Sequence, residues 1–369
     1  MAITLQELGL LENPFEYTTP TPSANMVWAG MHQQKRDITR CYEQAFQQNA
    51  RQLILNWGPW GGGKTYAAYY FKHNRIQYIA NYDQVVTIYI RTPEEGEKAS
   101  NELLNNIIDA IGWDALKNTI AQNAMLIGHD VLEQRLYDRI ASSEFARAVL
   151  KLATDTFTTD GYLLAQYFYN GLDKKEKAKY RISRDIKSIS DRIKFVSALL
   201  VAYTQTQAPK RLFIWIDEME NAIFYTAKQA KEYAQTIRDL TDTINEYVAI
   251  FLNLTLAEAD EQKIDLLLRE ALLSRINTRL RFKDFSTDDT LTYIRELLQA
   301  YQISPNPQQP YSPFTEDAIT TIIQQQLPTN KRLPRNINKT LHTIIQNALQ
   351  EDKTIIGVDD VKKTTTIFA

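Results

Sequence analysis

Cysteine and histidine are scarce in this chain of 369 residues, which has one cysteine, Cys41, and four histidines. A single cysteine excludes an internal disulfide and any zinc site built from several thiolates. The histidines are scattered along the sequence without the short spacings that metal ligands need: His32, His73, His129 and His342. Each histidine is therefore expected to be an ordinary surface or core residue.

Long apolar runs are also missing. No stretch approaches the roughly 18 residues that a membrane-crossing helix requires, and the N-terminus carries no signal-peptide pattern. We therefore expect a soluble, cytoplasmic protein without a membrane partner. The formal net charge of −2 excludes a surface that is basic overall, so any contact with DNA or RNA has to come from a local basic patch.

Glycine is sparse as well, yet four of the 12 glycines fall in one short run, LILNWGPWGGGKT, from Leu53 to Thr65. The run places the pattern G-x-x-x-x-G-K-[ST] directly behind an apolar stretch that is typical of a buried strand. Such glycines let the backbone curl so that successive N–H groups point at one centre, which is how a loop binds phosphate. The alternative is a glycine-rich turn with a stray lysine; a chance match is expected in about one chain of this length in a hundred.

The loop supplies the predicted nucleotide contacts. Lys64 can reach the β- and γ-phosphates, and Thr65 can offer its hydroxyl to Mg²⁺ at the start of the following helix. We predict that nine consecutive residues bind the nucleotide: Gly58, Pro59, Trp60, Gly61, Gly62, Gly63, Lys64, Thr65 and Tyr66.

A carboxylate pair far downstream completes this chemistry. The apolar run Leu212 to Ile216 is typical of a strand buried on both faces, and it ends in Asp217 and Glu218. Ligands of open α/β sheets bind at the C-terminal edge of the strands. We expect Asp217 to hold Mg²⁺ and Glu218 to polarise the attacking water, so that the protein hydrolyses ATP, with ATP and Mg²⁺ as its cofactors. Taken alone, the pair is also compatible with a solvated strand end.

The whole chain divides into four predicted parts. Residues 1–25 form an N-terminal arm, and residues 26–285 form a P-loop ATPase domain of the α/β class with a parallel sheet. A helical insertion at about 92–210 interrupts that domain, because this segment is far longer than one crossover helix requires. Residues 286–369 have a wholly helical pattern and form a second domain. Predicted strands and helices include 85–90, 248–255, 277–282, 33–49, 101–111, 186–203, 315–326, 336–350 and a short helix near Val358.

Basic residues gather inside the insertion. Residues 172–194 hold nine Lys or Arg against four Asp or Glu. Such a run is commonly a solvated helix face; the other interpretation is a contact with nucleic acid.

This order of parts resembles the AAA+ ATPases, and the resemblance covers most of the chain apart from the insertion. It implies a central sheet of strand order 5-1-4-3-2 and a helical lid that closes over the nucleotide. Val27-Trp28-Ala29-Gly30 is similar to the family's segment over the adenine, so Val27 and Trp28 are expected to bind the nucleotide. Within the family, the chain looks most like the origin-recognition ATPases and the bacterial regulators of DNA transposition and phage defence.

The resemblance also implies further site residues. Thr255, with Asn253 on the same face of its strand, matches the polar "sensor 1" position that helps to place the water. Arg275 resembles the arginine finger offered to a neighbouring subunit, with Arg279 as the second candidate. Leu333-Pro334-Arg335-Asn336 is similar to the lid motif whose arginine, Arg335, serves as "sensor 2".

Three functions follow from these observations. The leading one is an oligomeric ATPase switch, a ring or filament that assembles with ATP on DNA or on a protein partner of a DNA-processing or defence system. The alternative is a signalling or scaffold ATPase that gates an effector protein without touching nucleic acid. A polypeptide-pulling motor is disfavoured, because the segment after the second strand, 91–97, is acidic and has no aromatic residue for a pore loop.

Overall fold

The computed structural model describes residues 3–18, 26–47, 52–74, 84–155, 160–205, 210–244, 247–257 and 260–364. The last part of the predicted N-terminal arm, 19–25, lies outside the described residues. The chain forms two compact units. The sheet unit comprises Thr39–Asn56 and Ile76–Leu280, and the lid unit comprises Met1–Ile38, Trp57–Arg75 and Arg281–Ala369.

A five-stranded parallel sheet has the order β2-β3-β4-β1-β5. Counted from the other edge this is 5-1-4-3-2, so the predicted fold class and strand order are confirmed. Every residue of β1 and β3 is buried, which explains why their sequences are apolar runs without alternation. The strands are β1 (Gln52–Gly58), β2 (Val85–Arg91), β3 (Arg211–Asp217), β4 (Val248–Thr255) and β5 (Thr278–Arg281).

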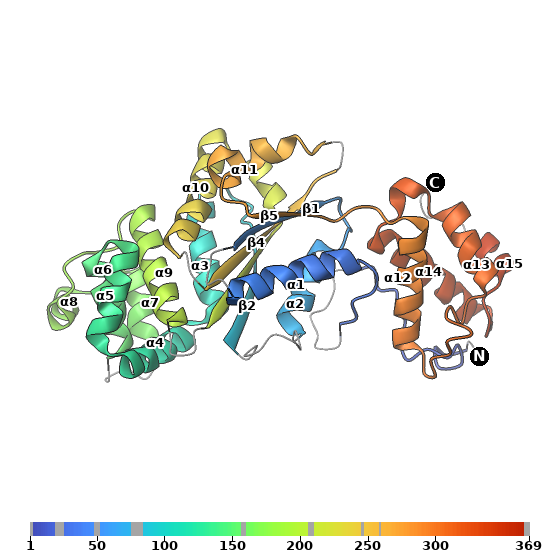
Figure 1. The fold of residues 1–369 in the computed structure, drawn as a ribbon, viewed down its shortest axis with the longest axis horizontal. Helices are drawn as coiled ribbons and strands as arrows, with labels where there is room; N and C mark the ends of the chain where they lie inside the picture. The colour runs from blue at the N-terminus through green and yellow to red at the C-terminus, as the bar shows by residue number, and fades with distance from the viewer. Residues whose placement is uncertain are drawn as a thin grey trace. The chain divides into compact units, whose positions relative to one another are not determined.

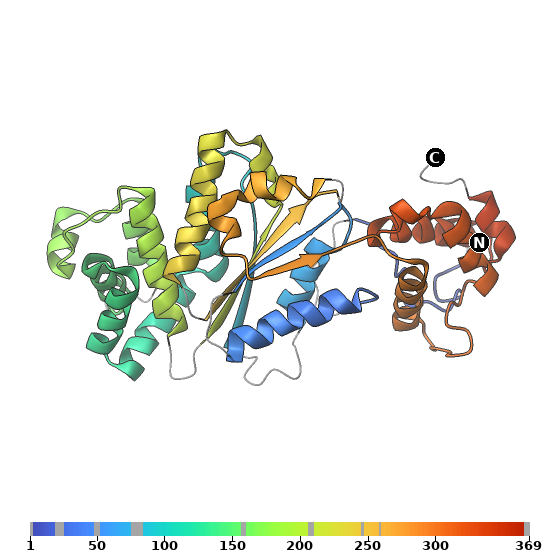
Figure 2. The ribbon, with the colours of Figure 1, turned by 45° about the horizontal axis from the view of Figure 1, so that its top comes forward.

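Aromatic side chains fix helix α1 (His32–Gln47) on one face of this sheet. The ring of Tyr42 stacks on Phe213 at 3.8 Å between centroids, and its hydroxyl accepts a hydrogen bond from the indole N–H of Trp215. Trp215 in turn stacks on Phe251 at 4.2 Å. Phe213 and Trp215 are two residues apart on β3 and therefore point to the same face. Figures 1 and 2 show α10 (Ala227–Thr243) and α11 (Lys263–Leu273) on the opposite face.

The predicted insertion is a bundle of helices between β2 and β3 (Figure 1). Its core is built from leucine, isoleucine and phenylalanine side chains that are fully buried, such as Leu136, Phe145 and Phe195. The helices are α3 (Ala99–Ile111), α4 (Trp113–Ile127), α5 (His129–Ile140), α6 (Ser143–Ala153), α7 (Tyr162–Tyr169), α8 (Lys174–Tyr180) and α9 (Ile189–Thr204). A 3-10 helix, η2 (Met219–Phe224), follows β3.

The lid unit packs the N-terminal segment into a helical core. Leu10 and Phe15 are fully buried beside residues of the C-terminal helices, such as Ile294 and Leu341. The backbone of Leu10 also forms a bridge with Gln302. The domain boundaries expected from the sequence stay predictions. The helices are α2 (Lys64–His73), α12 (Thr287–Tyr301), α13 (Glu316–Thr321), η4 (Ile322–Gln326), η5 (Thr329–Lys331), α14 (Pro334–Gln350) and α15 (Val358–Lys363).

One predicted helix is irregular. The pattern over 315–326 indicates a single helix, but α13 ends at Thr321 and the chain continues as a π-helical turn, η4. In that turn the buried Gln326 donates its side-chain amide to the carbonyl of Val361, 2.8 Å away. Helical periodicity does not report such a turn, because a π turn changes the spacing by only one residue.

No helix within the described ranges is both long and apolar enough to cross a membrane.

Candidate nucleotide site

The predicted phosphate loop lies in the lid unit between β1 and α2. Gly58, Gly61 and Gly63 have φ angles of 151°, 80° and 97°, a region that residues with a side chain rarely adopt. The side chain of Lys64 is buried, and its ammonium group donates to the carbonyls of Gly58 and Pro59 at 2.8 and 2.9 Å. The loop thus holds a lysine charge against its own backbone at the start of helix α2.

Close packing explains two of these glycines. A Cβ on Gly58 would lie 2.0 Å from the carbonyl oxygen of Phe282, and a Cβ on Gly63 would lie 2.9 Å from the terminal methyl of Met31. A side chain at either position would displace the backbone or its neighbour. The curled loop therefore depends on glycine for space as well as for conformational freedom.

Helix α14 contacts the loop through Arg335. Its backbone N–H, in the first turn of the helix, donates to the carbonyl of Gly61 at 3.3 Å. Its guanidinium lies over the ring of Trp60, 3.7 Å from the ring centroid. The structure thus brings Arg335 to the predicted phosphate loop, and its role as the lid arginine stays a prediction.

The segment ahead of α1 packs on helix α2. Trp28 is buried, and its ring meets those of Tyr70 and Phe71 edge to face at 5.0 and 5.7 Å. Val27 is half-buried and accepts a hydrogen bond at its carbonyl from the Tyr66 hydroxyl. The nucleotide role predicted for Val27, Trp28 and Tyr66 stays a prediction; in this structure Trp28 is part of a packed aromatic cluster.

The predicted acidic pair lies in the sheet unit, where β3 ends. Asp217 is buried, and its carboxylate accepts hydrogen bonds from the Tyr89 hydroxyl at 2.8 Å and from the backbone N–H of Glu218 at 2.9 Å. Its backbone carbonyl accepts from the N–H of Thr92, which extends the pairing of β2 with β3. Asp217 is therefore held in one orientation from two sides.

Glu218 has an unusual backbone and environment. Its φ and ψ are 59° and 38°, a left-handed conformation that is strained for a residue with a side chain. Its carboxylate lies 3.8 Å from Nε of Arg91, at the end of β2. Burial raises the pKa of the Glu218 carboxyl; Arg91 opposes the rise, and three neighbouring carboxylates, Asp217, Glu220 and Glu94, add to it. A carboxylate of raised pKa is a better proton acceptor than an ordinary glutamate.

The two predicted sensor residues on β4 differ in exposure. Asn253 is fully buried, and its side-chain oxygen Oδ1 accepts a hydrogen bond from the side-chain amide of Asn56 on β1 at 2.9 Å. Thr255 is half-exposed at the end of the strand, and its N–H donates to the Glu220 carboxylate at 2.8 Å. The structure thus brings Thr255 to the segment that follows the acidic pair, whereas Asn253 ties two strands together.

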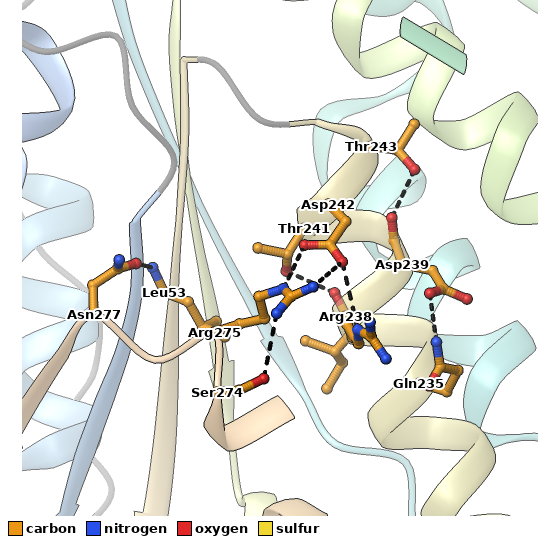
Figure 3. Close-up of polar contacts among 11 residues, drawn as sticks. Leu53, Gln235, Arg238, Asp239, Thr241, Asp242, Thr243, Ser274, Arg275 and Asn277 are labelled. Atoms are coloured by element: carbon orange, nitrogen blue, oxygen red, sulfur yellow. Dashed lines mark hydrogen bonds and ion pairs between the residues drawn. The ribbon is translucent and has the colours of Figure 1, made fainter. Parts of the chain in front are cut away.

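The two candidate finger arginines also differ. Arg275 donates from Nε and Nη2 to the two carboxylate oxygens of Asp242 on α10, at 2.8 and 3.1 Å (Figure 3). Arg238, one turn earlier on α10, lies 3.4 Å from the same carboxylate. Arg279 on β5 is exposed, and its side chain makes no hydrogen bond or ion pair with the described residues. Arg275 is therefore engaged within its own chain, and Arg279 is not.

A cluster of three or more metal-ligating side chains is not found among the described residues. The predicted Mg²⁺ ligands, Thr65 and Asp217, nevertheless have suitable chemistry, because a hydroxyl and a carboxylate are oxygen donors of the kind that Mg²⁺ binds together with water and phosphate.

Three residues at the predicted site were missed by sequence reasoning: Tyr89, Arg91 and Asp242. Tyr89 and Arg91 belong to an apolar strand whose partner is far away in the sequence, and the register that places Arg91 beside Asp217 is visible only in the sheet. Asp242 lies near the end of an amphipathic helix among other charges. Alternation along β2 could have indicated that Tyr89 and Arg91 share one face, but not what they face.

Comparison with known proteins gives similarity of structure alone. No protein-family model matches the chain, and no curated protein matches it. Among solved structures it is similar to Drosophila ORC bound to DNA, with 11% identity and a TM-score of 0.49, over 97% of this chain and 64% of that one. It is also similar to Cdc6p of Pyrobaculum aerophilum, with 13% identity and a TM-score of 0.48, over 93% of this chain and 68% of that one.

A third similar structure is the ORC2 protein of Aeropyrum pernix in ADPNP–ADP complexes, with 12% identity and a TM-score of 0.47, over 92% of this chain and 70% of that one. The chain spans less than two thirds of the Drosophila structure. Similarity at this level carries no argument about function, which has to come from the geometry of this chain.

Proposed function

We propose that this protein binds and hydrolyses ATP and uses the cycle as a switch. The observation that carries the proposal is the phosphate loop, in which a buried lysine and three glycines of positive φ stand at the N-terminus of a ten-residue helix. Backbone N–H groups and the helix dipole favour an anion there. Lys64 would exchange its two carbonyl partners, on Gly58 and Pro59, for phosphate oxygens.

Hydrolysis is assigned to the end of β3. Glu218 would accept the proton of the attacking water, and Asp217, oriented by Tyr89, would hold Mg²⁺ together with Thr65. Bound Mg²⁺ would neutralise charge on the phosphates. The assignment of loop and acids to one nucleotide rests on the sequence pattern, because a phosphate loop and a strand that ends in a carboxylate pair are the two parts that ATP hydrolysis needs.

Nucleotide titration tests this proposal. Lys64→Ala should weaken the binding of a non-hydrolysable ATP analogue by about a hundredfold or more, because it removes a buried charge from the phosphates. Lys72→Ala, an exposed lysine on the same helix, is the matched control and should bind normally. Glu218→Gln should bind the analogue but lose about a hundredfold in turnover, whereas the exposed Glu95→Gln should not. Normal affinity in a folded Lys64→Ala protein would refute the proposal.

We further propose that the active form is an oligomer in which a neighbouring subunit supplies an arginine to the transferring phosphate. The exposed Arg279 fits this role better than Arg275, whose guanidinium is bound to Asp242. The Arg279→Ala variant should then hydrolyse ATP slowly by itself, and mixing it with the Glu218→Gln variant should restore part of the turnover. If co-assembled mixtures never exceed the two separate activities, the same test with Arg275→Ala decides whether any arginine acts between subunits.

DNA is the proposed partner, through the exposed part of the basic stretch 172–194. Several of its cations are neutralised internally: Lys177 pairs with Asp185, and Arg184 pairs with Asp191. The exposed cations that make no ion pair within the described ranges are Lys174, Lys175, Arg181 and Lys187. Such free charges can release counterions from a phosphate backbone, so DNA affinity should fall steeply with added salt.

A matched pair of charge reversals tests the DNA contact. Changing Lys174 and Lys175 together to Glu should abolish DNA binding and leave ATP affinity intact. The control changes Lys228 and Lys231, two exposed lysines of α10, in the same way and should keep DNA binding. If the unaltered protein shows no salt-dependent DNA affinity, the alternative applies: an ATPase that gates an effector protein without nucleic acid.

A further inference from the structure

The side chain of Trp60 is exposed although it is large and aromatic. It belongs to the phosphate loop, yet it is 64% exposed. Within the described ranges its ring makes one contact of the aromatic or cation kind, with the guanidinium of Arg335. Exposing a large aromatic side chain to water costs free energy, and the rest of this loop consists of glycine and proline. The contact with Arg335 therefore suggests a function for the ring.

Arg335 is held without using its side-chain donors. No N–H of its guanidinium makes a hydrogen bond or ion pair with any described residue. Stacking on a ring face attracts the charge but leaves the N–H groups at the guanidinium edge available for other partners. Its backbone N–H, bonded to Gly61, fixes the residue at the loop.

The neighbouring Arg332 shows the contrast. It donates from Nε to the carbonyl of Leu327, from Nη1 to the Thr287 hydroxyl and from Nη2 to the carbonyl of Ile323. Those bonds make Arg332 a structural tie of the helical core. Arg335 lies three residues later, and its guanidinium N–H groups make no such bonds with the described residues.

We propose that Trp60 is a positioning residue, which holds the guanidinium of Arg335 over the phosphate loop so that its N–H edge meets a phosphate of the bound nucleotide. This inference rests on the proposed nucleotide function and adds a role that the loop pattern does not contain. In this proposal Trp60 acts through Arg335, which departs from the sequence-based prediction that Trp60 itself binds the nucleotide. An ion pair with a carboxylate would hold the arginine as well, but it would consume the donors and neutralise the charge.

Two properties of the contact make the proposal specific. It depends on the electron-rich face of the ring, so phenylalanine should replace tryptophan in part, whereas leucine, which is apolar but has no such face, should not. It also depends on Arg335, so Trp60 should matter little once that arginine is gone.

The experiment is a double-mutant cycle read out by binding of a non-hydrolysable ATP analogue with Mg²⁺. Arg335→Ala should weaken binding about tenfold or more, and Trp60→Leu about three- to tenfold. Trp60→Phe should recover most of the Trp60→Leu loss, and the double variant should bind no more weakly than Arg335→Ala alone. Arg295→Ala, an exposed arginine of α12 in the same unit, is the control for charge and should bind normally.

Each other outcome overturns the proposal. Additive losses would mean that Trp60 contacts the nucleotide directly, and full rescue by leucine would mean that apolar bulk suffices. Normal binding by Trp60→Leu, in a protein whose binding depends on Lys64, would refute the role of Trp60 alone. Binding that is absent, or unaffected by Lys64→Ala, would refute the nucleotide function itself, so the two failures are distinguishable.

A measurement without nucleotide tests the stack in solution. Arg335→Ala should change the tryptophan fluorescence of the free protein, and the same substitution in a Trp60→Phe background should not. If the two changes are equal, the emission comes from other tryptophans and the stack does not form.

Discussion

The ion pair between Arg91 and Glu218 predicts how ATP hydrolysis depends on pH. A general base works only while it is unprotonated, so the rate should fall as the pH falls through the pKa of Glu218. Burial raises that pKa above the ordinary value of a glutamate, whereas Arg91 opposes the rise. Removing Arg91 should therefore raise the pKa further and move the acid limb of the pH–rate profile to higher pH.

The size of this effect follows from the geometry. At 3.8 Å the attraction between two unit charges is about 1 kcal/mol in a medium as polar as water. The two side chains are 58% and 41% exposed, so solvent, salt and side-chain freedom reduce the attraction to about 0.5 kcal/mol. That free energy corresponds to about 0.4 in pKa.

The assay is the pH dependence of kcat for ATP hydrolysis in the unaltered protein, Arg91→Ala and Arg91→Lys. Arg91→Ala should shift the acid limb upward by about 0.4, and Arg91→Lys, which keeps the charge, should shift it less. Glu218→Gln should have low activity without that limb. If the pH–rate profiles of the unaltered protein and Arg91→Ala superimpose, or if the acid limb of Arg91→Ala lies at lower pH, then Glu218 is not the base or Arg91 is not its partner.

Three further predictions follow from single contacts. Tyr89→Phe removes the hydrogen bond that orients Asp217, and should lower Mg²⁺-dependent turnover about tenfold while costing about 1 kcal/mol of unfolding free energy in urea titration. Arg275→Ala should lower the midpoint of the same titration, because it breaks a two-point pair with the partly exposed Asp242, and Arg275→Lys should recover only part of the loss since an ammonium lacks the planar fork that matches both carboxylate oxygens. Gly58→Ala should abolish nucleotide binding and lower the melting temperature, because its Cβ would lie 2.0 Å from a carbonyl oxygen; a normal melting curve and normal binding would contradict the observed loop.

Much of the fold was predictable because its signals are local. β3 and β4 are continuous apolar runs, and the structure gives β4 the same limits, Val248–Thr255, that the sequence indicates. The strand order came from the resemblance to AAA+ ATPases, and the structure confirms it. The π-helical turn at Ile322–Gln326 was not predictable, since it depends on a bond between Gln326 and a residue of the last helix.

The candidate site was predictable to a smaller degree. The glycine pattern identifies the loop, and the carboxylate pair after an apolar run identifies the strand edge, because each motif consists of consecutive residues. The partners of those groups are not, because they come from segments that are distant in the sequence. Asp217 is oriented by Tyr89 across 128 positions, and this depends on the pairing of two strands on either side of a helical insertion.

The arginines show why the partners matter for function. The resemblance offers Arg275 as the first candidate for the finger, Arg279 as the second, and Arg335 as the arginine of the lid motif. The structure separates them by what holds each guanidinium: a carboxylate for Arg275 and an aromatic face for Arg335, whereas Arg279 is exposed and makes no ion pair with any described residue. A carboxylate neutralises the charge and occupies the donors, whereas a ring face fixes the group and leaves both available to phosphate. Under the proposed function, Arg335 would bind a phosphate of the nucleotide held by its own subunit, and Arg279 would reach the nucleotide of a neighbouring subunit. Arg275 would have to leave Asp242 before it could bind a phosphate of either nucleotide.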